Sequence, residues 1–192
     1  MKSLSCTVTD FFVDKGIVDR TQKDIYEYGL ELIIADIINF TLILTISALV
    51  KSLVTGVLFS FCFPTLRRFC GGYHAKKRWT CRVFTISTFL AVWVCAQLLS
   101  SYGVWLTVPF GILSLAIMLL YSPVENPSKP LSVNGKSRNR KRSLLIFSIY
   151  GCTAIILSVF GYQEGMVVSL TILAVVLLII VSQILKRKEG SI

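Results

Sequence analysis

Long apolar stretches, separated by short polar ones, recur along almost the whole chain. Of its 192 residues, 54% are hydrophobic and only 16% are charged. A helix needs about 20 mainly apolar residues to cross the hydrocarbon layer of a bilayer. Inside that layer a helix satisfies its own backbone polar groups. The sequence therefore predicts an all-α, polytopic membrane helical bundle with about six transmembrane helices, in a single domain that covers residues 1–192.

Turn signals delimit the predicted elements. Residues 1–29 mix charged and apolar side chains, which is typical of an amphipathic interfacial segment. We expect two short helices on the membrane surface there, with Asp19 as the N-cap of the second and Gln22 three residues on. The bundle is predicted to occupy residues 30–185, followed by a tail at 186–192. The expected spans are residues 30–50, 53–66, 83–99, 104–121, 143–160 and 166–185.

Prolines set two of the predicted boundaries. The second span is expected to close near Pro64, and its length of about 14 residues would rise only about 21 Å as a helix. That is less than the ~30 Å thickness of the hydrocarbon layer. Pro123, Pro127 and Pro130 argue against a regular helix in the polar segment 122–142.

The distribution of basic residues predicts the orientation of the spans. The formal net charge is +10, and the basic residues gather in a few segments between the spans and at the two ends. If both termini are cytoplasmic, six crossings leave Lys51 alone among the 20 Lys and Arg residues on the outer side. The positive-inside rule requires this kind of asymmetry. We therefore expect a multi-pass protein with cytoplasmic N- and C-termini.

Several classes of protein do not fit this composition. Basic residues in loops between spans serve orientation, so nucleic-acid binding is not expected. The six cysteines are scattered without a CxxC pair, which does not indicate a disulfide framework. The first 25 or so residues lack the apolar core of a cleavable signal peptide. No internal repeat is visible, which disfavours a transporter built from two related halves.

The polar stretch "RRFCGGYHAKKRWTC", residues 67–81, contains the only histidine and two of the six cysteines. Gly71 and Gly72 allow the backbone to turn sharply. His74 and Cys81 are seven residues apart, which on an unbroken helix places them on one face but about 10.5 Å apart along the axis. A nucleophile and its base need to approach to about 2.6–3.2 Å. If the two residues act together, the chain between them must bend.

This stretch suits thiolate chemistry. Cys81 is expected near the amino end of the third span, where the helix dipole and basic neighbours stabilise an anion. His74 could then serve as the base toward the thiol and as the acid toward a leaving amine. Two alternatives stay open: an interfacial histidine with a packing cysteine, or a metal site of Cys70, His74 and Cys81. A closed zinc site lacks a fourth ligand here, and the surroundings are cationic. Arg67 and Arg68 are expected to anchor the membrane interface or to bind a carboxylate.

These residues resemble the signature of the accessory gene regulator B (AgrB) family of bacterial membrane peptidases. The stretch 67–81 is similar to the family's signature of Arg, Gly-Gly, His and Cys, with His and Cys seven apart. "PVENPSKPL" at residues 123–131 is similar to its proline-bearing cytoplasmic loop, and "YGLELII" at residues 28–34 resembles its first-span entry. Length, hydrophobic layout and basic clusters agree over essentially the whole chain.

The resemblance implies a cysteine endopeptidase of quorum sensing in a bacterial plasma membrane. Such proteins cut a short ribosomal precursor peptide (AgrD) near its carboxyl end and hold the remainder as a thioester. They pass it to a Cys or Ser of the same peptide, which closes a thiolactone or lactone ring. By resemblance Cys81 is the nucleophile, His74 is the general base and acid, and Gly71 and Gly72 shape the site. The expected partners are an AgrD-like precursor, membrane lipid and a second copy in a homodimer, and neither a cofactor nor a metal is expected.

Further roles follow less directly. Of the two arginines, Arg68 is preferred for the family's arginine position. Glu31 and Asp36 lie within the first span, and Glu31 is the better candidate for a group that orients the histidine. Both could instead pair with a basic side chain of another helix. The basic residues between 136 and 142 are expected to contact anionic lipid or to attract an acidic precursor tail. The competing classes are a transporter or exporter of a small peptide, and a receptor or scaffold.

Overall fold

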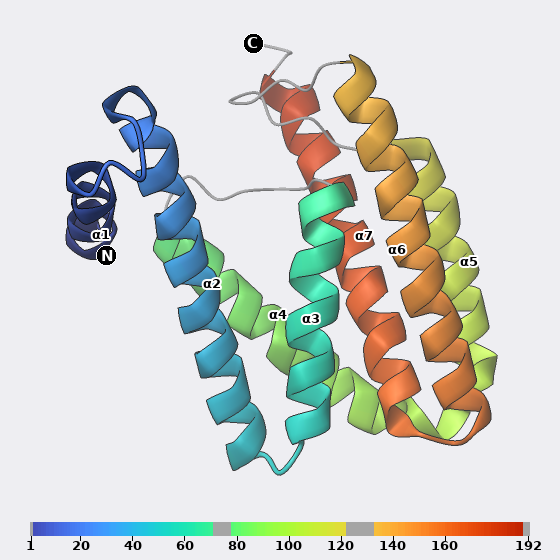
Figure 1. Cartoon of the computed structure of the whole chain (residues 1–192). Coiled ribbons are helices and arrows are strands. Elements are labelled where there is room, and N and C mark those ends of the chain that lie inside the picture. Colours follow the sequence, from blue (N-terminus) through green and yellow to red (C-terminus); the bar gives the residue numbers. More distant parts are fainter. Residues whose placement is uncertain (1, 71–77, 122–132, 190–192) are drawn as a thin grey trace. The chain divides into compact units, whose positions relative to one another are not determined.

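A computed structural model describes residues 2–70, 78–121 and 133–189 of the chain (Figure 1). Within these ranges the chain forms seven α-helices, two short 3-10 helices and no strand. The elements are α1 (Lys2–Asp14), η1 (Arg20–Gln22), α2 (Lys23–Leu49), α3 (Leu53–Cys70), α4 (Arg78–Leu99), η2 (Ser100–Tyr102), α5 (Val104–Tyr121), α6 (Val133–Val159) and α7 (Gln163–Glu189). The predicted all-α class is confirmed.

Six of these helices are long and apolar enough to cross a membrane. The segments that meet this condition are Arg20–Leu49, Leu53–Cys70, Trp79–Tyr102, Val104–Tyr121, Ser137–Val159 and Gln163–Ile184. The predicted number of spans is therefore confirmed, and the chain is a multi-pass membrane protein. The fourth predicted span, residues 104–121, coincides with α5.

The second span is longer than the sequence predicts. α3 continues through Pro64 to Cys70 and has 18 residues, which corresponds to a rise of about 27 Å. The expected end near Pro64 is wrong. A proline inside a helix loses one backbone hydrogen bond, and a membrane helix that packs against its neighbours tolerates such a loss.

Two other boundaries also differ from the prediction. α6 begins at Val133, ten residues before the expected span, so the basic residues between 136 and 142 belong to a helix and not to an irregular segment. The reason is that Pro130 is the last proline of that region, and nothing after it prevents a helix. The second expected surface helix does not exist separately, because α2 begins at Lys23 and runs without interruption to Leu49.

The chain divides into two compact units, residues 1–45 and residues 46–192. In unit 1, α1 ends at a turn in which Gly16 has a φ of 68°, a conformation that favours glycine. Asp19 then caps η1, because the backbone N–H of Thr21 donates a hydrogen bond of 3.0 Å to its carboxylate. The expected role of Asp19 as an N-cap is thus confirmed, at the 3-10 turn that leads into α2.

An acidic side chain of α1 joins it to the start of α2 within unit 1. The Asp10 carboxylate lies 2.5 Å from the ammonium of Lys23. This hydrogen-bonded ion pair holds the pKa of Asp10 below its usual range. The thiol of Cys6 also donates to Asp10, across 3.5 Å, and the carboxylate raises the pKa of Cys6 because it stabilises the protonated thiol and repels a thiolate.

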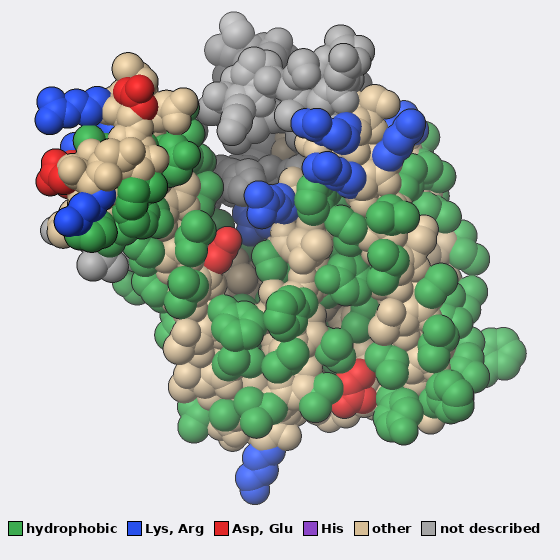
Figure 2. Space-filling view, viewed as in Figure 1, with side chains coloured by type: hydrophobic (Ala, Val, Ile, Leu, Met, Phe, Trp, Pro, Cys, Tyr) green, Lys and Arg blue, Asp and Glu red, His purple; other side chains and the backbone are tan. Residues whose placement is uncertain are grey.

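Unit 2 is organised around α7, which contacts α3, α4, α5 and α6 (Figure 1). Two-thirds of the membrane segment of α7 is buried, the highest share among the six candidate spans. Val167, Val175 and Ile179 are completely or almost completely enclosed. Figure 2 shows basic side chains gathered at one end of this unit, over the start of α6, while hydrophobic side chains cover its flanks. This distribution is typical of a bundle that is surrounded by lipid.

The hairpin between α6 and α7 depends on a close approach at Gly165. A Cβ atom at this position would lie 2.6 Å from the backbone nitrogen of Ser158 and 2.7 Å from the carbonyl oxygen of Ala154. Only a residue without a side chain allows α6 and α7 to pack at this distance. The hydroxyl of Ser158 also lies 2.8 Å from that of Thr107, which ties α5 to the same corner.

Gly165→Ala is expected to lower the thermal unfolding temperature of the purified protein in detergent. The added methyl group must push apart two backbones, and overpacking of this kind costs about 1–3 kcal/mol. Gly111→Ala is the matched control, because a Cβ there would meet no heavy atom within 4 Å. Circular dichroism during heating measures both variants. Equal unfolding temperatures for the two variants would contradict the close approach at Gly165.

Asp10→Asn is expected to increase several-fold the rate at which a maleimide labels Cys6 near neutral pH. The substitution removes the carboxylate that raises the pKa of the thiol, so a larger fraction is thiolate. Asp14→Asn removes a carboxylate from the same helix and is the control. Peptide mass spectrometry resolves the label on each cysteine. An equal increase in both variants would mean that the contact between Cys6 and Asp10 does not control the thiol.

Candidate functional site

The candidate site lies where α3 ends and α4 begins. α3 ends at Cys70 and the described part of α4 begins at Arg78. Gly71, Gly72 and His74 belong to residues 71–77, which lie outside the described residues. The approach of His74 to Cys81 therefore stays a prediction.

Cys81 lies in the first turn of α4 and is half-buried. Its carbonyl oxygen accepts a hydrogen bond of 3.0 Å from the hydroxyl of Thr85, so the backbone at this position is helical and held. The first turn of a helix carries unpaired N–H groups and the positive end of the helix dipole, both of which favour an anion. The predicted place of Cys81, at the amino end of the third span, is confirmed.

Cationic and aromatic side chains flank Cys81 on α4. The guanidinium of Arg82 lies 5.5 Å from the ring centre of Trp79. Trp79 itself is 71% exposed, as is usual for an aromatic residue at a membrane interface. Cys81 therefore lies at the polar end of α4, next in sequence to the cation of Arg82.

Two contacts hold α4 against α3 below this level. The rings of Phe59 and Phe89 meet edge to face at 5.3 Å, and both side chains are completely buried. The indole N–H of Trp93 donates a hydrogen bond of 3.2 Å to the hydroxyl of Ser52, just before α3 begins. The first turn of α4 thus extends from a helix whose middle is fixed by packing.

The two neighbouring arginines of α3 point in different directions. Arg67 is only 8% exposed, whereas Arg68 is exposed. The guanidinium of Arg67 lies 5.7 Å from the ring centre of Phe63, one turn earlier, and Phe63 stacks on Phe59 at 5.0 Å. The buried face of α3 therefore continues through Arg67 to Cys70, which is 1% exposed. The sequence favours Arg68 for the site, and burial favours Arg67.

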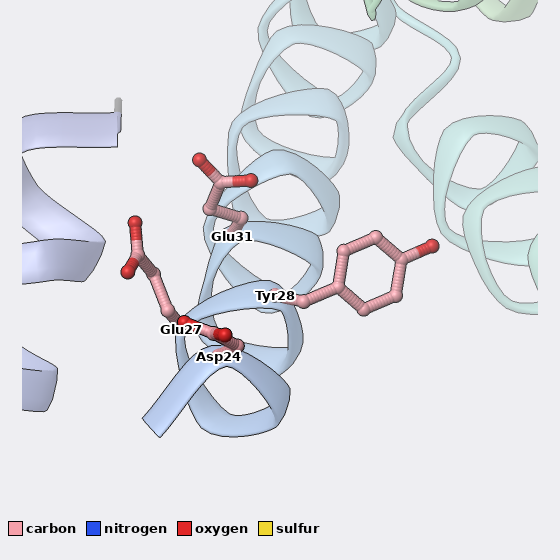
Figure 3. A pocket seen from close by; sticks show the side chains of 4 residues that line it. All are labelled: Asp24, Glu27, Tyr28 and Glu31. Atoms are coloured by element: carbon pink, nitrogen blue, oxygen red, sulfur yellow. The ribbon is translucent and has the colours of Figure 1, made fainter. Parts of the chain in front are cut away.

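Unit 1 contains a separate acidic pocket near the start of α2. Its volume is about 200 Å³, and Asp24, Glu27, Tyr28 and Glu31 line it. Figure 3 shows that Glu27 and Tyr28 leave α2 on different sides, with Glu31 one turn further along the helix. Glu31 is 7% exposed, whereas Asp36 is exposed. The candidate acid at position 31 is thus the enclosed one of the pair.

The sequence alone singled out only Glu31 of this pocket. Asp24, Glu27, Tyr28 and Glu31 are spaced three or four residues apart, which makes side chains on successive turns of a helix neighbours, so helical periodicity could have grouped the other three with Glu31. Sequence reasoning stopped the surface segment at residue 29 and so separated them from Glu31.

Within the described ranges, no three His, Cys, Asp or Glu side chains lie close enough together to hold a metal ion. The metal site considered above includes His74, so it stays untested.

Comparison with known proteins identifies the family of this chain. The family model for accessory gene regulator B matches residues 5–186. No solved structure matches the chain.

Curated relatives agree with that match. An AgrB-like protein of Clostridium beijerinckii is 27% identical over 156 residues, which cover 80% of this chain and 74% of the relative. An AgrB-like protein of Clostridium perfringens strain SM101 is 23% identical over 172 residues, 86% of this chain and 80% of the relative. One of Listeria monocytogenes serotype 4b, strain F2365, is 28% identical over 121 residues, 62% of this chain and 58% of the relative. The chain belongs to the accessory gene regulator B family, which links it to the agr quorum-sensing system.

Proposed function

We propose that this protein is a cysteine endopeptidase that cuts an AgrD-like precursor peptide and promotes its cyclisation. The observation that carries the proposal is the position of Cys81, half-buried in the first turn of α4 at the polar end of a family member's span. A thiol in that position has the helix dipole and cationic neighbours that favour a thiolate. Among the six cysteines, Cys62 and Cys70 are buried and so lack access to a peptide.

In the first step the sulfur of Cys81 attacks the carbonyl carbon of the scissile peptide bond. His74 takes the proton of the thiol and then gives it to the leaving amine, so the carbon–nitrogen bond breaks and a thioester forms. The carboxyl-terminal fragment leaves with its new amino group. The amino-terminal part of the precursor stays attached to the enzyme.

In the second step a Cys or Ser within the bound peptide attacks the thioester. The Cys81 sulfur leaves and recovers a proton, and a thiolactone or lactone closes. A thioester retains enough acyl reactivity for this exchange, whereas a plain peptide bond is a poor acyl donor. A site at the bilayer edge limits access of water and so suppresses simple hydrolysis.

Three supporting roles complete the proposal. Gly71 and Gly72 shape the turn that brings His74 to Cys81. Arg67 supplies the family's arginine, because its burial against Phe63 leaves it fixed, whereas Arg68 is exposed. A guanidinium held in this way keeps a positive charge near the end of α3, where the proposed catalytic stretch begins.

Glu31 is proposed to orient the histidine, since a thiol–imidazole pair commonly has a third group.

We further propose that both termini are cytoplasmic, that the chain forms one peptidase domain, and that it works as a homodimer in the bacterial plasma membrane beside lipid. The basic end of unit 2 supports the orientation through the positive-inside rule.

Cys81→Ala is expected to abolish cleavage of the precursor while the protein still inserts into the membrane. The protein is mixed with candidate precursors in lipid vesicles, and mass spectrometry looks for an acyl adduct on Cys81 and for a ring product. Cys70→Ala is the matched control and should keep both. Cleavage by the Cys81→Ala variant would overturn the proposal and favour a transporter, for which this thiol is dispensable.

His74→Ala is expected to reduce cleavage by about 10²–10⁴-fold, the usual contribution of a general acid–base group. The same variant should lose the preferential labelling of Cys81 by a thiol-reactive probe, because no base then takes its proton. Arg68→Ala serves as the control for a change in local charge. Labelling of Cys81 that is independent of His74 would argue for a receptor or scaffold.

A further inference from the structure

α5 and α6 enclose an apolar groove halfway along their length. It has a volume of about 250 Å³, and α7 forms its floor through Ser169 and Ile172. Gly111 of α5 and Gly151 of α6 lie in its walls. A Cβ at Gly111 would meet no heavy atom within 4 Å, so the missing side chain leaves real space between the helices. The groove exists because both walls have a glycine at this level.

Polar contacts close the seam between α5 and α6 at both ends of the groove. At one end the hydroxyls of Thr107 and Ser158 lie 2.8 Å apart. At the other, a guanidinium N–H of Arg140 donates a hydrogen bond of 3.1 Å to the carbonyl oxygen of Leu119, near the end of α5. Between them the rim is exposed, with Ile112 at 65%, and in a membrane protein such a surface faces lipid.

Basic side chains lie on the face of α6 that lines the groove, nearer to the amino end of the helix. Arg140, Leu144, Phe147 and Gly151 follow one another at intervals of four, three and four residues, which keeps them on one side of a helix. Lys141 precedes the groove residue Ser148 by two turns and flanks the same face. Both cations are exposed, and among the described residues the guanidinium of Arg140 makes one hydrogen bond.

The vertical spacing fits a lipid. The groove residues of α6 run from Phe147 to Ile155, so they begin about 10 Å below Arg140 and end about 22 Å below it, at 1.5 Å per residue. The hydrocarbon of one leaflet is about 15 Å deep, and the headgroup region above it adds about 5–7 Å. A phosphate held at the level of Arg140 and Lys141 therefore leaves an acyl chain at the depth of the groove.

We propose that this is a binding site for one phospholipid with an anionic headgroup. Arg140 and Lys141 hold the phosphate, and one acyl chain lies in the groove between Gly111 and Gly151. Basic residues at the edge of a seam between membrane helices are the usual partners of anionic headgroups.

A second copy of the chain is the other conceivable occupant. A two-fold contact through this seam would bring the same surface of both copies together. Arg140 and Lys141 of each copy would then face those of the other, and like charges that meet at an interface are unfavourable. The charges therefore favour an anionic lipid over self-association.

Native mass spectrometry of the full chain in detergent tests the site, with titration of phosphatidylglycerol and phosphatidylcholine of the same acyl chains. Phosphatidylglycerol should bind one molecule per chain, and more tightly than phosphatidylcholine. Arg140→Gln should weaken its binding about fivefold, the effect of one basic residue near a membrane surface. Gly111→Leu, which fills the groove, should weaken both lipids.

Each variant has a matched control. Arg138→Gln removes a charge from the opposite side of α6, and Ala116→Leu enlarges an exposed side chain of α5 outside the groove. Both should bind lipid as the unmodified protein does. Lys141→Gln replaces Arg140→Gln if the latter does not fold, since Arg140 also joins α6 to α5.

Three results would overturn the proposal: phosphatidylglycerol binding that Arg140→Gln, Lys141→Gln and Gly111→Leu leave unchanged, equal binding of phosphatidylcholine, and displacement of the lipid by soluble glycerol phosphate. The last would indicate a phosphate site without a role for the groove. Disulfide cross-linking of Cys152, which lines the groove, between two copies would equally overturn it and assign the groove to self-association.

Discussion

The burial of α7 is the constraint on which unit 2 depends. Water is absent from the hydrocarbon layer, so a central helix must satisfy its own polar groups and still let four neighbours approach. α7 meets both conditions with small hydroxyl residues: Thr171 is completely buried, and its hydroxyl donates 2.7 Å to the carbonyl oxygen of Val167. Gly165 allows α6 to come near at one end. The positions of α3 and α4, and with them Arg67 and Cys81, follow from packing on α7.

The number of spans could be predicted from the sequence because each is a long apolar run, and such runs need no tertiary information. Apart from those of α5, the ends of the helices could not be predicted in this way. A helix can extend beyond its apolar run into polar residues. α6 does so at its amino end: it begins at Val133, in a charged segment in which no proline interrupts the helix. α2 likewise begins at Lys23, because Asp19 and Thr21 start the helix well outside the apolar run. The predicted end near Pro64 is too early for a different reason, since packing keeps α3 helical where proline chemistry alone suggests an end.

At the candidate site, too, some features could be predicted from the sequence and others could not. Cys81 could be placed at the amino end of α4 because the apolar run after it is long. The sequence favours Arg68 for the site, but it could not predict which of Arg67 and Arg68 is buried, since adjacent residues on a helix point about 100° apart and the sequence does not fix the phase. Phe59 and Phe63 fix it, because their buried, stacked rings continue the face on which Arg67 lies. His74 belongs to residues outside the described ranges, and its approach to Cys81 stays a prediction.

Cations near the amino ends of two helices give the two proposals a common physical basis. α2 and α7 have an acidic residue in their first turns, Asp24 and Glu164. α4 and α6 have none there; Arg82 follows the first turn of α4, and Arg140 is the eighth residue of α6. Neighbouring positive side chains repel one another, and an anion relieves that repulsion. The helix dipole adds to this effect at Cys81, in the first turn of α4, but not at Arg140, because the dipole acts only within the first turn. In the two proposals, the anion is a thiolate with a precursor carboxylate at α4 and a lipid phosphate at α6.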